Sequence, residues 1–340
     1  MMLDERKRQV LRAIIDSYIE TAEPVGSRTI ARRHDLGVSS ATIRNEMADL
    51  EETGYLEQPH VSAGRVPSDK GYRFYVDTLM EPHAFSPLEY LRIQQEILGA
   101  QLSLERSIHE AARLLALLTQ SVSLVVAPSM DQLVFKHLQL VALEDTSILV
   151  TMVLHPGIVK NRLIRTEQEF TPEQINELSS ALNQKLKGVT YRDLGPTIFS
   201  EIIRDFGEIG QVLVELLLQG LSEEKGEQVY ASGAVNILNQ PEFKDVDRAK
   251  ALFEALEQKE HLLNVLSSAS RSSGVQVVIG HENLHDVMHD CSLVTATYYI
   301  GSDVVGTLGV IGPTRMDYAK VMAAVGLVSN SLSTLLTEQK

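Results

Sequence analysis

The first 60 residues fall into three short helical segments separated by two breaks, and no other feature constrains the fold as strongly. Apolar residues recur every three or four positions over residues 4–20, and Pro24 ends that segment. A short segment, SRTIARRHD, follows and stops at Gly37. Ser39 or Ser40 can then cap a third segment, ATIRNEMADLEET. Two helices joined by a short turn that contains glycine predict a helix-turn-helix.

Positive charge is concentrated at two places in this region of an otherwise acidic chain. The formal net charge is −14, so we expect no general attraction to nucleic acid, and any DNA contact must be local. Residues 24–44 carry four arginines against one aspartate, and residues 58–73 carry two arginines and one lysine against one aspartate. We therefore expect these two clusters to be the places where DNA is contacted.

The third helical segment presents a face suited to reading bases. Ile43, Met47 and Leu50 form its buried stripe, which leaves Arg44 and Asn45 facing outward. Arginine and asparagine are the side chains that bond bidentately to guanine and adenine edges. The small residues of its first turn allow close approach to a groove wall. This face is therefore predicted to contact base edges.

The stretch HVSAGRVPSDKGY, residues 60–72, has neither the alternation of a strand nor the spacing of a helix. It follows a possible strand, YLEQ, so it is predicted to form a hairpin tip and a return strand. Such a small-residue loop is typical of a wing along a DNA groove, with Arg65 at phosphate or the minor groove. The alternative is a helical packing module, residues 1–80, whose arginines are only solvated. The predicted DNA-binding residues are Arg28, Ser39, Ser40, Thr42, Arg44, Asn45, His60, Ser62 and Arg65.

Two blocks of the sequence resemble the HrcA family of heat-inducible transcription repressors. One is SSATIRNEMADLEETGYLEQPHVSAGRVPSDKGYRFYVD, and the other comprises VIGHEN, DCSLV and GTLGVIGPTRMDYAKV near the other end. Their order and the total length also fit, whereas residues 166–272 contribute little. The resemblance implies a winged helix-turn-helix, a GAF-like domain interrupted by a dimerising insertion, and an inverted-repeat operator upstream of chaperone genes. It also implies that the GroE-type chaperonin keeps the repressor in its DNA-binding form.

Beyond the N-terminal region the sequence predicts an α+β multidomain protein. Strand-like runs such as SLVVA and LVTMVL precede a mostly helical stretch, and further runs such as VQVVI and SLVTATYYI follow it. A sheet domain split by a helical insertion is the economical interpretation. The expected divisions are a winged-helix domain (1–80), a linker helix (81–116), a first GAF-like part (117–165), a mostly helical dimerisation insertion (166–272) and a second GAF-like part (273–340).

Three histidines in GHENLHDVMHDC could form a metal site. His281, His285 and His289 are spaced by four residues, so in a helix their imidazoles would share one face that zinc could use. An ordinary solvated helix face explains the same pattern, and the family resemblance assigns these histidines no metal role. We therefore predict no metal, and keep these three as the candidates.

The stretch GTLGVIGPTR is spaced by glycines and precedes a helix, which raises the question of an anion site. It lacks the Lys-Ser/Thr of a P-loop and the spacing of a dinucleotide-binding loop. Its glycines are better explained by bulges or tight packing in a strand. The sequence also lacks a GxSxG elbow, an HExxH pair and a zinc-type cysteine framework, so we expect neither an enzyme nor a cofactor.

Cysteine content and hydropathy indicate a cytoplasmic protein without membrane contact. Cys291 is the single cysteine, which excludes an internal disulfide and fits a reducing compartment. No apolar run approaches the roughly 18 residues of a membrane helix. Arg12 and Asp16 interrupt the apolar residues that follow the charged start, so a signal peptide is not expected.

The predicted function is a dimeric winged-helix repressor of heat-shock operons, maintained by the chaperonin and lost on heat stress. The competing class is a ligand-responsive regulator that senses a metabolite in the GAF-like domain. The expected sheet pairs segments far apart in the sequence, and such pairing forms slowly and exposes strand-forming runs meanwhile. This favours a chaperonin-dependent protein.

Overall fold

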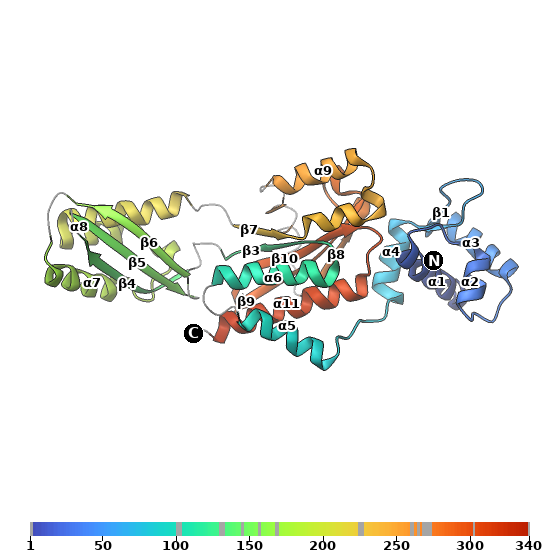
Figure 1. The fold of residues 1–340 in the computed structure, drawn as a ribbon, viewed down its shortest axis with the longest axis horizontal. Coiled ribbons are helices and arrows are strands. Elements are labelled where there is room, and N and C mark those ends of the chain that lie inside the picture. The colour runs from blue at the N-terminus through green and yellow to red at the C-terminus, as the bar shows by residue number, and fades with distance from the viewer. Residues whose placement is uncertain are drawn as a thin grey trace.

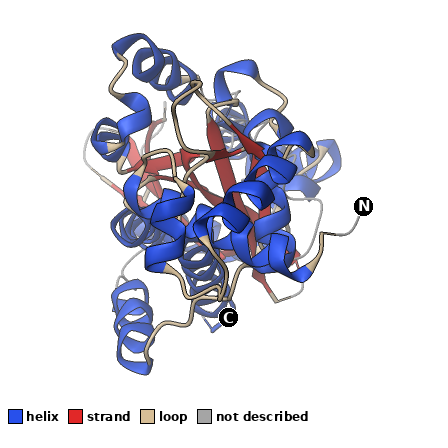
Figure 2. Ribbon diagram, turned by 90° about the vertical axis from the view of Figure 1, so that its right-hand side faces the viewer, coloured by secondary structure: helices blue, strands red, loops and turns tan. Residues whose placement is uncertain are grey.

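The computed structural model describes residues 3–99, 104–128, 133–143, 146–155, 158–166, 170–223, 228–258, 262–263, 266, 274–301 and 303–338. The protein is a mixed α+β chain whose parts follow one another along a long axis (Figure 1). We call these parts the N-terminal module (residues 3–79), the core domain (the described residues within 80–128 and 228–338) and the inserted unit (the described residues within 133–223). Figure 2, viewed from the end that carries the N-terminal module, shows helices around the strands.

The N-terminal module consists of three helices, a short hairpin and a fourth helix. Asp4 accepts a hydrogen bond from the Lys7 amide at 2.8 Å and so caps the first helix. The first three helices share one core. Each contributes a fully buried isoleucine to it: Ile14, Ile30 and Ile43. The elements are α1 (Glu5–Thr21), α2 (Ser27–Arg33), α3 (Ser40–Glu52), β1 (Leu56–Glu57), β2 (Val66–Pro67) and α4 (Asp69–Phe74), which continues as η1 (Tyr75–Leu79).

The core domain is built on an antiparallel sheet in the order β7-β3-β10-β9-β8. Alternate residues point to opposite faces, so Val125 and Val294 pack toward α6 and α11, whereas Leu124 and Leu293 pack toward α9. Its strands are β3 (Val122–Val126), β7 (Val229–Ser232), β8 (Gln276–Ile279), β9 (Cys291–Ile300) and β10 (Asp303–Pro313). Its helices are α5 (Pro87–Gly99), α6 (Leu104–Thr119), α9 (Val246–Glu257) and α11 (Tyr318–Glu338).

One helix of the core domain, over Tyr318–Thr337, is long and apolar enough to cross a membrane. More than half of it is buried inside the protein, where it packs on β9 and α6. Its apolar character is therefore that of a central core helix.

The inserted unit has its own sheet and its own hydrophobic core. Three strands pair in the order β4-β5-β6, and α7 and α8 contribute to a core separate from that of the sheet above. Asn183 of α7 bonds both to the amide of Leu138 at 2.8 Å and to its carbonyl at 2.6 Å, which covers the free edge of β4. The elements are β4 (Val134–Ala142), β5 (Ser147–His155), β6 (Ile158–Arg165), α7 (Pro172–Leu186) and α8 (Pro196–Glu223), which is kinked at Gly207.

The observed strand pairing differs from the divisions expected from the sequence. Of the strands within 117–165, only β3 joins the core sheet, because β4, β5 and β6 are consecutive hairpin neighbours that pair with one another. β7 lies inside the expected helical stretch 166–272 but pairs with β3. The interruption therefore runs from β3 to β7, and it combines the three-stranded sheet with helices α7 and α8. The expected linker 81–116 is two helices, and α6 is packed on the core sheet.

Candidate nucleic-acid interface

The first turn of α3 is fixed by its own polar residues. Ser39 Oγ accepts a hydrogen bond from the Thr42 amide at 3.2 Å and lies 3.0 Å from Thr42 Oγ1, which confirms the predicted cap. Ser39 is exposed, whereas Ser40 and Thr42 are half-buried. The following outward residues, Arg44 and Asn45, are exposed. The cap thus presents the start of α3 with both long polar side chains directed away from the core.

Three arginines of the N-terminal module carry uncompensated charge. Arg28 and Arg32 on α2 and Arg44 on α3 are exposed, and within the described residues their side chains have no ion pair or hydrogen bond. Neighbouring cations are engaged instead: Arg33 pairs with Glu20 at 3.2 Å, and Lys7 pairs with Glu46 at 3.0 Å. The free positive charge is therefore confined to two helices that pack on each other.

The hairpin of β1 and β2 carries a protruding loop, as the sequence predicts (Figure 1). His60, Val61 and Ser62 are exposed at its tip, and the Val61 side chain is 99% exposed. At the base, Gly64 approaches Val25 so closely that a Cβ would lie 2.5 Å from the Val25 carbonyl carbon. The base of the loop therefore rests on the connection between α1 and α2, and the tip projects.

The structure places Arg65 at the base of this loop and not near its tip. Its guanidinium pairs with Glu51, with Nη2 2.7 Å and Nε 2.8 Å from Oε2, and its side chain is only 19% exposed. The backbone of Arg65 forms an isolated β-bridge with Val25, which holds the residue against the connection between α1 and α2. The prediction that Arg65 stands ready for phosphate or the minor groove therefore does not fit this geometry.

The second predicted basic cluster is also used inside the protein. Lys70 donates to the Thr53 carbonyl at 2.7 Å and lies over the Tyr55 ring at 4.4 Å. Arg73 forms an ion pair with Glu282 of the core domain. Together with Arg65, all three cations of residues 58–73 thus have internal partners. A count of charges along the sequence predicts a second DNA contact, but the partners that engage these cations come from the end of α3 and the turn after it and, for Arg73, from a residue 209 positions away.

The three candidate metal ligands do not share a helix face. Residues 280–289 form two 3-10 turns, η6 (Gly280–Glu282) and η7 (Asp286–Met288), so the predicted four-residue periodicity has no structural counterpart. The cause is Asn283, whose buried amide lies within hydrogen-bond distance of three carbonyls in this segment. His281 and His289 stack at 4.4 Å between ring centroids, whereas His285 precedes the second turn. Among the described residues, no group of three or more potential metal ligands is found.

The glycines of GTLGVIGPTR serve close packing, as predicted. Residues 306–313 of the stretch lie in β10, and a Cβ at Gly309 would lie 2.8 Å from Thr295 Cγ2 on the neighbouring strand. A Cβ at Gly306 would overlap the Tyr298 ring. These glycines let adjacent strands and side chains approach each other.

Exposed arginines without an internal partner in the described residues, on one helical module, are suited to contacts with an anionic polymer such as DNA, as a transcription regulator requires. The family described as HrcA protein C terminal domain matches residues 105–322. The heat-inducible transcription repressor HrcA of Desulforamulus reducens is 42% identical over 339 residues, which cover 99% of this chain and 98% of that protein. The corresponding repressor of Brevibacillus brevis is 43% identical over 341 residues and covers 99% of each chain.

A solved structure shares the fold over the whole length. The crystal structure of a hypothetical protein at 2.2 Å resolution is 26% identical, covers 100% of both chains and superposes with a TM-score of 0.70. The chain therefore belongs to the HrcA family of heat-inducible transcription repressors. This membership confirms the family predicted from the sequence and indicates a regulatory, non-enzymatic role. It does not favour the competing class, a metabolite-responsive regulator.

Proposed function

We propose that this chain represses chaperone operons by binding an inverted-repeat DNA operator as a homodimer. The N-terminal module acts as a winged helix-turn-helix, with α3 in the major groove and the loop of residues 58–65 as its wing. One observation carries this proposal. In a chain of net charge −14, the exposed arginines on α2 and α3 have no ion-pair or hydrogen-bond partner within the described residues.

The proposed contacts divide into base-reading and positioning groups. Arg44 and Asn45 reach base edges because they are exposed and long enough for bidentate bonds. Arg28, at the first turn of α2, neutralises phosphate. The small polar residues around the α3 cap, Ser39, Ser40 and Thr42, allow close approach, and His60 and Ser62 contact the groove from the wing tip. Arg65 is assigned to holding the base of the wing.

The dimer is proposed to form through the inserted unit, while the core domain is assigned the GAF-like role. In the three-stranded sheet, Val141, Leu149 and Leu163 lie in one cross-strand row, and Val153 and Val159 lie in another. Both rows alternate with the residues that face α7 and α8, so they belong to the outer face. Exposed apolar side chains on that face support burial against a second copy of the chain.

Dependence on the GroE-type chaperonin is proposed from the topology of the core sheet. β3 pairs with β10, so Leu124 lies opposite Gly309, and most of the chain separates the two partners. Such non-local pairing is slow to form and leaves strand-forming runs exposed. During heat stress the chaperonin is occupied by other unfolded proteins, active repressor declines and the chaperone genes are released. We assign the repressor to the cytoplasm and propose that it acts without a membrane, a cofactor or a metal.

The deciding experiment is a footprint on the upstream regions of the host's chaperone operons. Protection of two symmetric half-sites is expected; Arg44→Ala should require a higher protein concentration for the same protection, while Arg92→Ala should not. Arg92 is a matched control because it is exposed on α5, outside the N-terminal module. Protection that is absent, or that is equal on random DNA, contradicts the proposal.

The chaperonin arm of the proposal is tested by refolding from denaturant with operator binding as the readout. Chaperonin plus nucleotide should raise the active fraction above spontaneous refolding, and excess unfolded competitor should cancel the gain. Complete spontaneous recovery without a response to chaperonin would remove this arm and leave the DNA-binding arm in place.

A further inference from the structure

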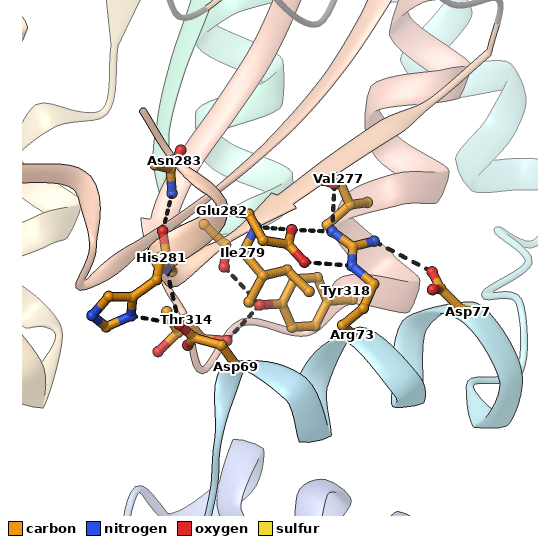
Figure 3. Close-up of polar contacts among 12 residues, drawn as sticks. Asp69, Arg73, Asp77, Val277, Ile279, His281, Glu282, Asn283, Thr314 and Tyr318 are labelled. Carbon is orange, nitrogen blue, oxygen red and sulfur yellow. Dashed lines mark hydrogen bonds and ion pairs between the residues drawn. The ribbon is translucent and has the colours of Figure 1, made fainter. Parts of the chain in front are cut away.

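The N-terminal module is joined to the core domain by a set of polar contacts that the proposed function does not use. They connect α4 with the end of β8 and the turn after it (Figure 3). We call Asp69, Arg73, Gly280, His281 and Glu282 the interdomain joint. These residues include part of the IGHEN stretch, whose role the sequence left unassigned.

Arg73 is held in one orientation by partners on both sides of the joint. Its Nε donates to Glu282 Oε1 at 2.8 Å, and its Nη2 donates both to the other carboxylate oxygen and to the Val277 carbonyl at 2.7 Å. Nη1 donates to Asp77 on its own side at 3.3 Å. Glu282 is itself fixed, because it also accepts from the Ile279 amide at 2.8 Å. A two-point contact of this kind restricts rotation as well as distance.

Asp69 forms the second half of the joint. Its Oδ2 accepts from the His281 amide at 2.9 Å and lies 2.7 Å from His281 Nδ1. Gly280 has φ +50°, and a Cβ at this position would overlap the Asp69 carboxylate. Glycine is therefore needed both for the backbone conformation and for the close approach of α4.

Two further contacts between the N-terminal module and the core domain lie beside the joint. Arg315 of the core domain donates to the Ile19 carbonyl of α1 at 2.6 Å and to Glu242 at 2.6 Å. The buried Tyr72 ring packs on Tyr318 with 5.8 Å between ring centroids. Residues of the N-terminal module and the core domain thus belong to one continuous hydrophobic cluster.

We propose that the interdomain joint fixes the N-terminal module on the core domain and thereby sets the spacing between the two recognition helices of the dimer. Asp69, Arg73, Gly280 and Glu282 are positioning residues for the choice of operator spacing. This inference rests on the proposed function as a dimeric operator-binding repressor. The physical reason is that one N-terminal module is sufficient to bind a half-site, whereas a fixed distance between half-sites requires a rigid connection between each N-terminal module and the dimer interface.

The DNA test compares Arg73→Gln, Glu282→Gln and their combination with the unchanged chain. Each protein is titrated onto one half-site and onto operators whose half-sites are moved apart in steps up to about half a helical turn, roughly five base pairs. Half-site affinity should be retained, while the preference for the best spacing falls about tenfold, as expected for contacts within one ion-pair network. The double variant should lose no more than either single variant. Arg92→Gln, which breaks an ion pair within α5, is the control and should keep the full preference.

A second measurement tests, in the absence of DNA, whether the interdomain joint holds the N-terminal module in place on the core domain. Spin labels are attached at Val61→Cys on the wing tip and Val235→Cys on the core domain, in a chain that also carries Cys291→Ala. The labelled chain is diluted with unlabelled chain, so that only the distance within one chain is measured. The distribution should be narrow for the unchanged joint and broad for Arg73→Gln. An equally narrow distribution in both overturns the inference, as does an unchanged spacing preference. Failure of the unchanged chain to bind any operator overturns the proposed function, and the distance measurement still decides whether the joint holds the module.

Discussion

The side-chain amide of Gln58 donates to the carbonyl oxygen of Val61 at 2.9 Å, so a half-buried residue at the foot of the hairpin holds the conformation of its tip. The same nitrogen donates to the Ala63 carbonyl at 3.1 Å. Val61 is thereby kept in solvent, where an apolar side chain gains nothing for the folded monomer. Its location is explained if the tip meets another surface.

Val61→Ser should leave thermal stability within about 0.5 kcal/mol of the unchanged chain, because the side chain has no packing to lose. Operator affinity should fall, as measured by fluorescence anisotropy. Gln58→Ala should lower the affinity as well, because it loosens the loop. Leu284→Ser, at another exposed apolar position outside the N-terminal module, is the control and should change neither quantity. Unchanged affinity in both wing variants would show that the tip does not reach DNA.

Arg44→Ala should cost roughly 1–3 kcal/mol on the operator and much less on random DNA, because a base contact is lost and a general charge effect is small. The residue has no internal partner within the described part of the chain, so folding should be unaffected. Competition titrations on both DNAs measure the difference. Equal losses on the two DNAs would assign Arg44 to phosphate.

Arg65→Ala should act on stability and not on the salt dependence of DNA binding. The half-buried ion pair with Glu51 is worth about 1 kcal/mol, so thermal unfolding should shift to lower temperature. Glu51→Gln should have a similar effect, and the double variant should lose little more than either, because both act on one contact. A decrease of about one unit in the salt slope of operator binding would instead place Arg65 on phosphate.

Cys291 should report unfolding of the core sheet. Burial, and next the negative charge of Asp290, raise the pKa of its thiol from 9.0 to about 12. The native chain should therefore resist iodoacetamide at pH 8 and react only when the sheet opens. Above pH 9 the unfolded thiol ionises while the folded thiol stays protonated, so this group lowers stability progressively between pH 9 and about 12.

The measurement is the urea midpoint at pH 8 and pH 10 for the unchanged chain and for Cys291→Ala. The unchanged chain should lose more stability over this interval than the variant, because other titrating groups are common to both. An equal loss, or rapid alkylation of the native protein, would contradict the buried neutral thiol.

Leu163→Glu should dissociate the dimer if the outer face of the β4-β5-β6 sheet is the interface. Leu163 is 59% exposed and lies opposite Leu149 on the edge strand β6, so a charge there is tolerated by the monomer but not by a buried contact. Sedimentation velocity measures the change. Leu88→Glu, at an exposed leucine on α5, is the control and should stay dimeric. A dimer that survives Leu163→Glu places the interface elsewhere.

The local sequence determined the helices of the N-terminal module and the face of α3. Caps and apolar periodicity act within a few residues, so Asp4, Ser39 and the buried stripe of Ile43, Met47 and Leu50 could be predicted from neighbours alone. The hairpin after α3 was predictable for the same reason. Strand-forming runs in the core domain were also predictable, because alternation and β-branched content are local properties.

Only the tertiary structure decided which strands share a sheet and which charges are free. β4 to β6 and β3 have similar strand character, yet β4 to β6 pair with their neighbours along the chain, whereas β3 pairs with β10 and β7, which lie far away in the sequence. From the sequence, Arg65 and Arg73 were predicted to contribute positive charge for DNA, but in the fold they form ion pairs with Glu51 and Glu282. Arg73 and Glu282 are 209 residues apart, and a contact over such a separation depends on how whole elements pack. Coulombic attraction depends on the distance between two charges in the folded chain. A local sequence pattern therefore does not reveal which charges become neighbours.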